Sequence, residues 1–581
     1  MDYHGQEFRP NAGDDFLELS SMPVDKQRQT QLWQQNQYLD DSGIQSGLTS
    51  HVPSIISGGT DYLSAPNEKV GWAQRRAYDS MSVISTGDAL VSSAPPSASS
   101  INFGSMEPFG DSVNMDLRGN QLQDIDSSEV AAAIPDLIKV MRENENHSVL
   151  YQAAIMIFQL SKSEAIEALI GSDEMIVEVI QTLSKTEDPD MIRFFAGTLY
   201  NISQTQKGLK AIFNANCIPC LIKLLDSNIE SVLFYAITTL HNLLLHQDGA
   251  KPLVRAEGKN CLRSMCVLLR KNNVKFLTIL TDCLQILAYG HAESKLIILQ
   301  HGGPQELVRI LYQYSYEKLL WTTARVLKVL SVCSMNKPAI IQVGGLDALG
   351  RHLISSSNSQ RLTMNCLWTL RNLSDAAASV TNVSIVPGSR NSLQNLLSAL
   401  IQLLTSSDPA MVACSAGILS NLTCNNCTNK LLVCQCDGIK QLLAAVASNP
   451  SRNDILEPCV CALRHLTARH DGEEAARAVL AARDKLDGLP LLTRVLHAAT
   501  AAVCPELGLL PTQNQQQSPL NWGLVKAMVG LIRNLALNRE LHTCMREYGL
   551  VTGLNWLLYG TLISIFSARK VSLIQRQQLS Y

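Results

Sequence analysis

The stretch Ala236-Ile-Thr-Thr-Leu-His-Asn-Leu-Leu-Leu-His246 contains a four-residue motif, Leu-x-Asn-Leu, that recurs along the chain. Some copies are strict and others are looser, with Ile or Val at an apolar position or another residue in place of Asn. The residues at the Asn position are Gln159, Asn201, Asn242, Ile286, Val329, Asn372, Asn421, His465 and Asn534. Successive copies lie 41 to 49 residues apart, apart from one interval of 69. Such a period is typical of an α-helical solenoid.

The composition fits a helical repeat protein, with 46% hydrophobic, 17% charged and 5% aromatic residues among 581. Residues 1–127 hold 17 Asp and Glu against 7 Lys and Arg, whereas the remainder holds 34 and 41. An acidic arm before a basic body indicates an acidic ligand or nucleic acid. All 16 cysteines follow residue 216, and no N-terminal segment resembles a signal peptide. We therefore expect free thiols in the cytoplasm or nucleus.

The acidic arm, residues 1–127, lacks helical periodicity and is rich in Ser, Gly, Gln, Asp and Pro, so we expect it to be disordered. Its one regular pattern is a serine ladder, Ser42, Ser46, Ser50 and Ser54, that follows Asp40-Asp41. This spacing suits a kinase that reads a phosphate four residues away and then adds the next. The alternative is an ordinary serine-rich tail.

From residue 128 to 550 the helical periodicity persists, and we expect two longer helices and one short helix per repeat. Several repeats open with a small residue and Pro, as at Ala133-Ile-Pro135 and Gly303-Pro304. The Gly would end one helix, and the Pro would suit the first turn of the next. Two polar insertions, Ala376–Ser392 and Ala499–Leu520, are predicted as surface loops.

Residues 551–581 are predicted to be a divergent tail. Leu550–Ala568 carries no charge and precedes Arg569-Lys570, and about 20 apolar residues can span a bilayer. Asn555, two Gly and several Ser and Thr dilute this segment. We therefore favour a divergent last repeat over a membrane anchor.

Stacked repeats would place the Leu-x-Asn-Leu helices along one groove, with their leucines facing the core. An Asn amide offers both a donor and an acceptor, so a row of them could pair with the backbone of an extended peptide. The alternative is that each Asn holds one repeat to the next. The residue before the Asn position becomes mostly basic from the fifth repeat on, as Lys328, Arg371, Arg464 and Arg533. This change favours an acidic peptide ligand.

Long blocks of the sequence resemble the β-catenin family of armadillo-repeat proteins. They are Ser231–His246, Thr281–Gly290, Tyr316–Thr323, Cys366–Asp375 and Gly417–Asn426. The resemblance covers about residues 20–60 and 128–550. It implies an all-α, right-handed armadillo-repeat superhelix of about nine repeats plus a partial tenth. It also implies a scaffold and transcriptional co-activator of Wnt-type signalling in the cytoplasm and nucleus, and at cell junctions.

The same resemblance gives the serine ladder a role, because Asp41-Ser42-Gly43-Ile44-Gln45-Ser46 is similar to the family's phosphodegron. It implies that a casein kinase primes Ser54 and that glycogen synthase kinase then modifies Ser50, Ser46 and Ser42, on destruction-complex scaffolds. An F-box ubiquitin ligase would read the phosphorylated degron, with Lys26 as the ubiquitin acceptor.

The resemblance also assigns the groove. Lys295 and Lys430 match lysines that grip acidic side chains of T-cell-factor-type and cadherin-type ligands. Other matches to groove positions are Phe234, His241, Asn242, Tyr289, Lys318, Arg371, Asn372, Asn421, Arg464, His465, Lys526 and Arg533.

The chain also departs from the family pattern. The family has twelve repeats and an acidic activation tail, whereas matching ends here in the tenth repeat. A truncated modulator that binds the transcription factor without activating it is therefore an alternative. Glu107–Ser128 shows little of the amphipathic helix that binds α-catenin in the family, so the resemblance gives no support for that partner.

Other classes of protein are less consistent with the sequence. An importin-α-like transport adaptor would need Trp one turn before many of the Asn positions and an acidic groove, and only Trp368 fits. Nucleic-acid binding is not expected, because the basic face lacks interleaved aromatic residues. Cys424, Cys427, Cys434 and Cys436 have nearly the spacing of zinc ligands, but the family match places them on helix ends. We expect no metal, no cofactor and no enzyme activity.

Overall fold

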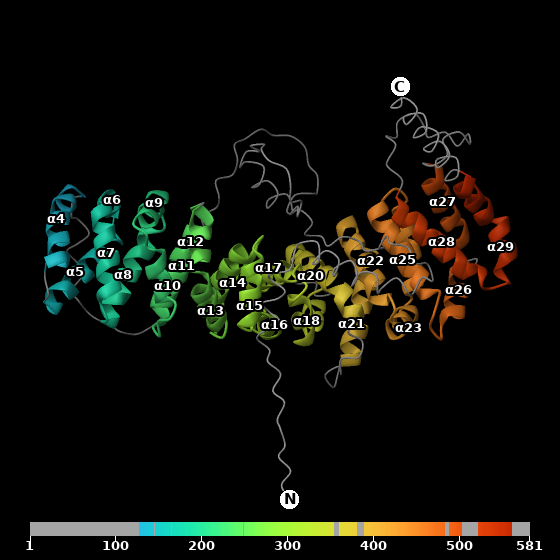
Figure 1. Cartoon of the computed structure of the whole chain (residues 1–581), viewed down its shortest axis with the longest axis horizontal. Helices are drawn as coiled ribbons and strands as arrows, with labels where there is room; N and C mark the ends of the chain where they lie inside the picture. The colour runs from blue at the N-terminus through green and yellow to red at the C-terminus, as the bar shows by residue number, and fades with distance from the viewer. Residues whose placement is uncertain are drawn as a thin grey trace, which may run out of the picture. The chain divides into compact units, whose positions relative to one another are not determined.

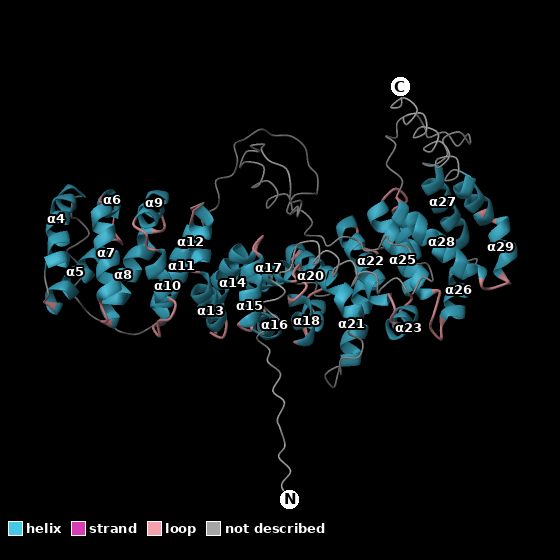
Figure 2. Ribbon diagram, in the orientation of Figure 1, coloured by secondary structure: helices cyan, strands magenta, loops and turns pink. Residues whose placement is uncertain are grey.

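The computed structural model describes most of residues 127–559. Within that range it leaves out residues 144–145, 164–165, 248, 354–358, 380–388, 483–486 and 502–520. The described residues form helices and short connections and contain no β-strand (Figure 2). The predicted all-α fold class is confirmed. The boundaries drawn at residues 127 and 550 stay predictions, because the arm and the tail lie largely outside the described residues.

Nine helices in the described ranges carry the Leu-x-Asn-Leu motif, and we call them the H3 helices. They are α5 (His147–Leu160), α8 (Pro189–Ile202), α11 (Glu230–His246), α14 (Val274–Ala288), α17 (Glu317–Leu330), α20 (Gln360–Ser379), α22 (Pro409–Thr423), α25 (Asn453–Leu466) and α28 (Trp522–Ala536). Every predicted motif therefore lies on a helix.

The other helices precede the H3 helices and complete the repeats. They are α4 (Ser127–Glu143), α6 (Ile166–Gly171), α7 (Asp173–Lys185), α9 (Gln206–Asn214), α10 (Ile218–Leu224), α12 (Ala250–Ala256), α13 (Gly258–Leu268), α15 (Ala292–Gln300), α16 (Gly303–Gln313), α18 (Asn336–Gln342), α19 (Gly345–Gly350), α21 (Ser389–Leu403), α23 (Cys427–Gln435), α24 (Gly438–Ser448), α26 (Glu473–Ala481) and α27 (Gly488–Ala501). After α28 come α29 (Leu541–Glu547) and an apolar helix, Leu550–Tyr559, at the place of the predicted tenth repeat.

The chain divides into two compact units, and the boundary falls inside α20. Among the described residues, the first unit ends at residue 372 and the second begins at residue 373. In the first unit, α5, α8, α11, α14 and α17 pack side by side in that order (Figure 1). In the second unit, α22 packs against α25 and α25 against α28.

The two apolar positions of the motif contribute to the core of both units. From Ile157 and Leu160 in α5 to Ile532 and Leu535 in α28, each of these side chains is at most 6% exposed. Burying one such side chain contributes about 1.5–3 kcal/mol. Each repeat therefore gains stability mainly by covering the apolar stripe of its neighbour.

The corner between the first two helices of a repeat explains the small residues noted in the sequence. Gly302 (φ 74°), Gly344 (φ 87°) and Asp437 (φ 57°) are left-handed, as is Asp487 (φ 40°), and each lies one position before a glycine predicted to end a helix. Gly303 instead begins α16. A Cβ atom on it would lie 2.8 Å from the Ile298 carbonyl oxygen, so Gly303 is needed for close packing.

Three sequence predictions about boundaries need correction. Pro135 does not open a helix, because it lies inside α4. The predicted loop Ala376–Ser392 is helical at both ends, since α20 runs to Ser379 and α21 begins at Ser389. Alanine is the strongest helix former, and three alanines follow Asp375, so α20 continues. Helix α27 likewise extends to Ala501, inside the second predicted loop.

Within the described residues, no single helix is long and apolar enough to cross a bilayer. One pair, α23 and α24, meets that length and composition together but is bent by 75°. The apolar segment that raised the anchor alternative is described only as far as Tyr559.

Candidate functional site

The candidate site is the surface of the H3 helices that carries the Asn position, the residue before it, and the residues one or two turns earlier. We call this surface the H3 face. All but three of the predicted groove residues lie on H3 helices, and the exceptions are Tyr289, Lys295 and Lys430. The two units are described separately below.

The Asn side chains of the motif join each H3 helix to the one before it. Each amide nitrogen donates a hydrogen bond to a hydroxyl of the preceding repeat. The pairs are Asn201 to Ser161 (2.9 Å), Asn242 to Ser203 (3.2 Å), Asn372 to Ser331 (3.1 Å), Asn421 to Ser374 (2.9 Å) and Asn534 to Thr467 (3.3 Å). Asn372 is 1% exposed and Asn421 is 8% exposed. Of the two interpretations left open by the sequence, these contacts support the one in which Asn holds repeats together.

The hydroxyl partners are a feature that the sequence analysis missed. A Ser or Thr directly follows the motif in six repeats, so the fuller pattern is Leu-x-Asn-Leu-Ser/Thr. The hydroxyls of Ser161, Ser203 and Ser331 each donate to the carbonyl three residues earlier, at 2.7, 2.7 and 2.8 Å. This bond turns a hydroxyl lone pair toward the next repeat, where the Asn amide reaches it.

His465 occupies the Asn position of α25 and, like the Asn side chains, connects its helix to the preceding repeat. Its Nδ1 lies 3.1 Å from the Ser420 carbonyl oxygen and 3.3 Å from the Thr423 hydroxyl, both in α22. His465 is 4% exposed. Its side chain therefore connects two repeats of the second unit, and it lies beside the predicted binding residue Arg464 (Nη2 to His465 Nε2, 3.2 Å).

An ionic network joins three H3 helices in the middle of the first unit. Asp282 of α14 lies 2.9 Å from His241 Nε2 of α11 and accepts a 2.9 Å hydrogen bond from Arg325 of α17. Arg325 also donates to Gln285 at 2.9 Å. Burial acts to raise the pKa of Asp282, but the His241 hydrogen bond and the Arg325 charge lower it below its usual value. The predicted groove residue His241, 4% exposed, is thus a member of this network.

Cations line the H3 face beyond this network in the first unit. Lys318, Trp321, Arg325 and Lys328 follow one another at three- or four-residue intervals, so they share one side of α17. Arg325 lies 4.8 Å from the ring of Trp321. Lys328 lies 4.5 Å from the ring of Trp368 in α20. The predicted residues Lys318 and Phe234 are half-buried, whereas Arg371 is 3% exposed.

The second unit has its own cationic group on α25 and α28. Lys526 has a lowered pKa because of burial and because of the nearby Arg464 charge. Arg464 crosses α28 at Gly530, where a Cβ atom would lie 2.6 Å from the Arg464 Cδ. Arg533, one turn further along α28, is exposed. Three predicted residues, Arg464, Lys526 and Arg533, therefore belong to one group.

The two lysines assigned to acidic ligand side chains differ from each other. Lys295 is half-buried on α15. Lys430, on α23, is 1% exposed, and its ammonium donates to the Ala468 carbonyl at 2.9 Å. Its side chain must swing outward before it can bind a ligand. Tyr289, at the end of α14, is 45% exposed.

Aromatic rings cover the H3 face of α5, α8 and α11. They are Tyr151, Phe158, Phe194, Tyr200, Phe234 and Tyr235, all half-buried. The rings stand at different offsets from the motif in successive helices, so the motif alone does not reveal them. The expectation of no interleaved aromatic residues concerned the basic face of the later repeats. There Trp321 and Trp368 lie beside Arg325 and Lys328, so that expectation is wrong for α17 and α20.

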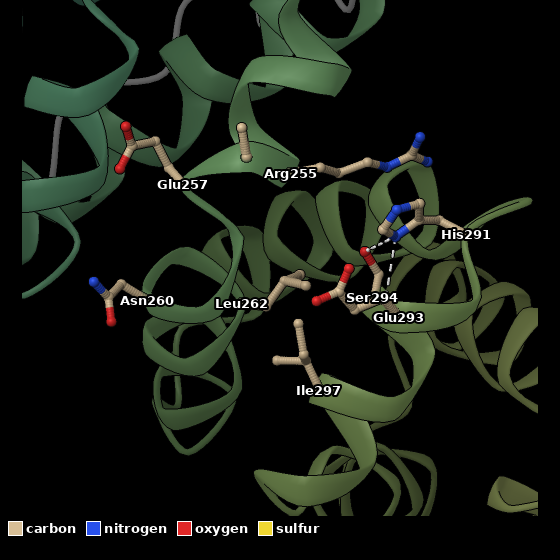
Figure 3. Close-up of a pocket in the computed structure, with 9 residues that line it drawn as sticks. Arg255, Glu257, Asn260, Leu262, His291, Glu293, Ser294 and Ile297 are labelled. Carbon is tan, nitrogen blue, oxygen red and sulfur yellow. Dashed lines mark hydrogen bonds between the residues drawn. The ribbon is translucent and has the colours of Figure 1, made fainter. Parts of the chain in front are cut away.

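A cavity of about 330 Å³ lies between α12, α13 and α15, beside Tyr289. Figure 3 shows Arg255 extending toward His291, with Glu257 and Asn260 on the other side. Arg255 donates to the carbonyls of Leu287 and Tyr289, both at 3.1 Å. These bonds cap the end of α14, so the Arg255 guanidinium in this cavity stabilises the helix end.

Possible metal ligands and modification sites are the cysteines of the second unit and the residues of the acidic arm. Among the described residues, no group of three or more His, Cys, Asp or Glu side chains could hold a metal ion. The thiol of Cys427 donates to the Arg469 carbonyl at 3.2 Å. The serine ladder, the degron residues Asp41 and Gly43, and Lys26 lie outside the described residues, and their roles stay predictions.

Comparison with known proteins gives a consistent result. The family described as Armadillo/beta-catenin-like repeat matches residues 205–245 and 333–375, which correspond to α9–α11 and α18–α20. "Catenin beta" of Urechis caupo is 43% identical, over 92% of this chain and 65% of the relative. "Junction plakoglobin" of Rattus norvegicus is 42% identical, over 90% and 69%. "Armadillo segment polarity protein" of Drosophila melanogaster is 44% identical, over 91% and 61%.

The chain thus spans less than two thirds of the length of the catenin and armadillo relatives. A solved structure is also similar, with a TM-score of 0.57, 29% identity, and coverage of 70% of this chain and 83% of the other. It is described as "A conserved phosphorylation switch controls the interaction between cadherin and beta-catenin in vitro and in vivo". On identity over nine tenths of its length, the chain belongs to the β-catenin and plakoglobin family of armadillo-repeat proteins.

Proposed function

We propose that this protein is a scaffold of cell adhesion and Wnt-type signalling that binds extended acidic peptides on its H3 face. The observation that carries the proposal is the grouping of cations on that face. Lys318, Arg325 and Lys328 share one side of α17, and Lys526 lies near Arg464 in the second unit. Acidic side chains are the complementary ligands, and arginine pairs with carboxylates through two parallel bonds.

The proposed ligands are T-cell-factor-type transcription factors and cadherin cytoplasmic tails. The similar solved structure concerns an interaction between cadherin and β-catenin, and one relative is a junction protein by name. Another relative is named for segment polarity, which supports a role in signalling. We propose the cytoplasm, the nucleus and cell junctions as locations. Family membership alone carries the cadherin and transcription-factor assignments.

We also propose that the acidic arm sets the protein's abundance. In this proposal a casein kinase and glycogen synthase kinase modify Ser54, Ser50, Ser46 and Ser42 in that order, and an F-box ubiquitin ligase directs ubiquitin to Lys26. The regular spacing of the serines supports it. If Ser42→Ala does not lengthen the protein's half-life in cells with active glycogen synthase kinase, the degron proposal fails.

Peptide binding is tested by fluorescence anisotropy with three labelled probes. They are an acidic T-cell-factor-type peptide, a basic nuclear-localisation peptide and a poly(U) RNA. We expect only the acidic peptide to bind. An importin-α-like adaptor would bind the basic peptide instead. On the described H3 face Trp368 fits that class, but the grouped cations disfavour a basic ligand.

Charge reversals identify the binding surface. Lys318→Glu and Arg533→Glu should each weaken binding of the acidic peptide by about tenfold, because a like charge then faces the ligand. Lys430→Glu is a poor test, since it would bury an unpaired carboxylate. The matched controls are Lys185→Glu on α7 and Lys440→Glu on α24, which lie on exposed parts of other helices. If the H3 variants bind as well as the controls, the proposed surface is wrong.

A further inference from the structure

The cavity of about 330 Å³ between α12, α13 and α15 lies apart from the H3 face, because none of the described residues that line it belongs to an H3 helix. Helix α12 packs against α13, and α13 packs against α15, so the cavity joins two neighbouring repeats of the first unit. We call it the charged cavity. Its polar lining residues are Arg255, Glu257, Asn260, His291, Glu293 and Ser294.

Arg255 provides donors on one side of the charged cavity. A guanidinium has five N–H donors, and Arg255 uses two of them for the carbonyls of Leu287 and Tyr289. Among the residues that the structure describes, none forms an ion pair with Arg255. Its remaining N–H groups are therefore available to an anionic ligand.

His291 adds a donor on the same side, and Figure 3 shows its ring near the end of the Arg255 side chain. The Nδ1 atom of His291 accepts a hydrogen bond from the Ser294 backbone N–H at 3.1 Å. Burial and the Arg255 charge lower the pKa of His291, so the ring is neutral at pH 7 and carries its proton on Nε2. This N–H and the guanidinium together form a side suited to a carboxylate.

Acceptors occupy the rest of the charged cavity. Figure 3 shows Glu257 and Asn260 on the far side from Arg255, and Glu293 adds a second carboxylate from the first turn of α15. All three side chains belong to exposed residues. In the described part of the chain neither carboxylate has an ion-pair partner. Two such carboxylates are complementary to a basic side chain.

The openness of the charged cavity indicates what kind of ligand carries these groups. Pockets for small molecules are lined mainly by apolar side chains and bury most of their ligand. Here only Ala256, Leu262 and Ile297 are apolar, and Ala256, Glu257 and Glu293 are exposed. Side chains that reach in from a peptide outside the cavity fit this lining better than an enclosed metabolite does.

We propose that the charged cavity binds an acidic and a basic side chain that stand two positions apart in an extended peptide. A volume of about 330 Å³ has a cube root of roughly 7 Å, close to the spacing of about 6.6 Å between residues i and i+2 of an extended chain, which point to the same side. The acidic side chain pairs with Arg255 and His291, and the basic one with Glu257 and Glu293. This site lies on other helices than the H3 face, so it does not depend on the proposed function.

The main probe is a fluorescein-labelled peptide with blocked ends, in which the triplet Glu-Ser-Arg is flanked by Gly and Ser. Comparison peptides replace its Glu by Gln, replace its Arg by Gln, or place Glu and Arg next to each other, so that they point to opposite sides. The triplet Arg-Ser-Glu tests the direction of the chain. Free glutamate and free arginine are added as unlabelled competitors. Binding to the full chain is measured by fluorescence anisotropy.

The Glu-Ser-Arg peptide, in one of its two directions, should bind about fivefold more tightly than each comparison peptide, because each exposed ion pair adds a modest gain. The double variant Glu257→Gln/Glu293→Gln should remove this gain. The matched control is Glu474→Gln on α26, which is exposed in the second unit. Lys318→Glu on the H3 face should also leave binding unchanged. Arg255 is not replaced, because it caps α14.

Thermal unfolding shows whether each variant is folded, and the single variant Glu257→Gln serves if the double variant is unfolded. Equal binding of all the peptides, or a gain that persists without the two carboxylates, would overturn the proposal. Loss of the gain in Lys318→Glu would place the peptide on the H3 face instead. If free glutamate or free arginine competes as well as the unlabelled peptide, a small zwitterion replaces the peptide as the ligand.

Discussion

Replacing Asp282 by Asn removes one negative charge from the network that joins α11, α14 and α17, with almost no change in side-chain shape. The Asp282 side chain is 20% exposed and has His241 and Arg325 each at 2.9 Å. A hydrogen bond to a charged group contributes about 1.5–3 kcal/mol, and a neutral one about 0.5–1.5 kcal/mol. An Asn side chain can keep both contacts as neutral hydrogen bonds, through its amide oxygen and its amide nitrogen. The two bonds together favour the carboxylate by about 2 kcal/mol, and its burial offsets part of this gain. We therefore expect a loss of about 1 kcal/mol in the free energy of unfolding at pH 7.

This loss should depend on pH in a defined direction. The pKa of Asp282 is lowered in the folded chain, since the His241 hydrogen bond and the Arg325 charge outweigh the raising effect of burial. A carboxyl group of this kind stabilises the fold above its unfolded pKa of about 4, and the contribution is lost as the pH falls through the folded pKa. The difference between the unaltered chain and Asp282→Asn should thus be full at pH 7 and shrink below about pH 4.

Urea unfolding of the full chain at several pH values measures this difference. Repeat arrays can depart from two-state unfolding, so hydrogen exchange in α11, α14 and α17 should accompany it. Asp190→Asn is the control, because Asp190 pairs with Arg193 in an exposed contact that contributes little. Equal stabilities at pH 7, or a difference that persists undiminished at low pH, would refute the argument.

Three further predictions concern the repeats themselves. Asn242→Ala removes the hydrogen bond to Ser203 and should lower the free energy of unfolding by about 1 kcal/mol, measured by urea titration. If the free energy of unfolding does not change, Asn242 does not hold the repeats together, and ligand binding is its remaining role. Gly303→Ala forces a Cβ atom to within 2.8 Å of a carbonyl oxygen and should cost about 1–3 kcal/mol, visible as a lower midpoint of thermal unfolding. Burial raises the pKa of Cys366 to about 12, whereas Cys427 is exposed. Thiol alkylation of the native chain followed by mass spectrometry should therefore modify Cys427 before Cys366, and early labelling of Cys366 would contradict its burial.

The H3 helices could be predicted from sequence because their signal is local. Two apolar residues three apart, repeated in each motif, require a helix with one buried face. The positions of Leu199 and Ile202, 0% and 1% exposed, follow directly from that pattern. The continuation of α20 past Asp375 could not be predicted in the same way, because a polar composition and a helical alanine run gave opposite indications.

The roles of the polar residues depended on partners about forty residues away. Asn201 could face a ligand or a neighbouring repeat, and only the position of Ser161 decides between them. Lys430 matches a ligand-binding position by residue type, but its exposure depends on where the Ala468 carbonyl lies. Such choices are made by packing between repeats, which no single motif contains.

The repeats of the first unit are not joined by the same kind of bond throughout. Ile286 and Val329 occupy the Asn position in α14 and α17, and neither side chain can donate a hydrogen bond. The carboxylate of Asp282 serves there instead, through its contacts with His241 and Arg325. Dissolved salt screens charges more than it affects neutral hydrogen bonds. Asp282 and His241 are largely buried, which weakens that screening, and the Thr281 hydroxyl also donates a hydrogen bond to the Thr322 hydroxyl at 2.8 Å. We therefore expect strong salt to loosen this stretch only slightly, so that a stretched chain does not yield there first.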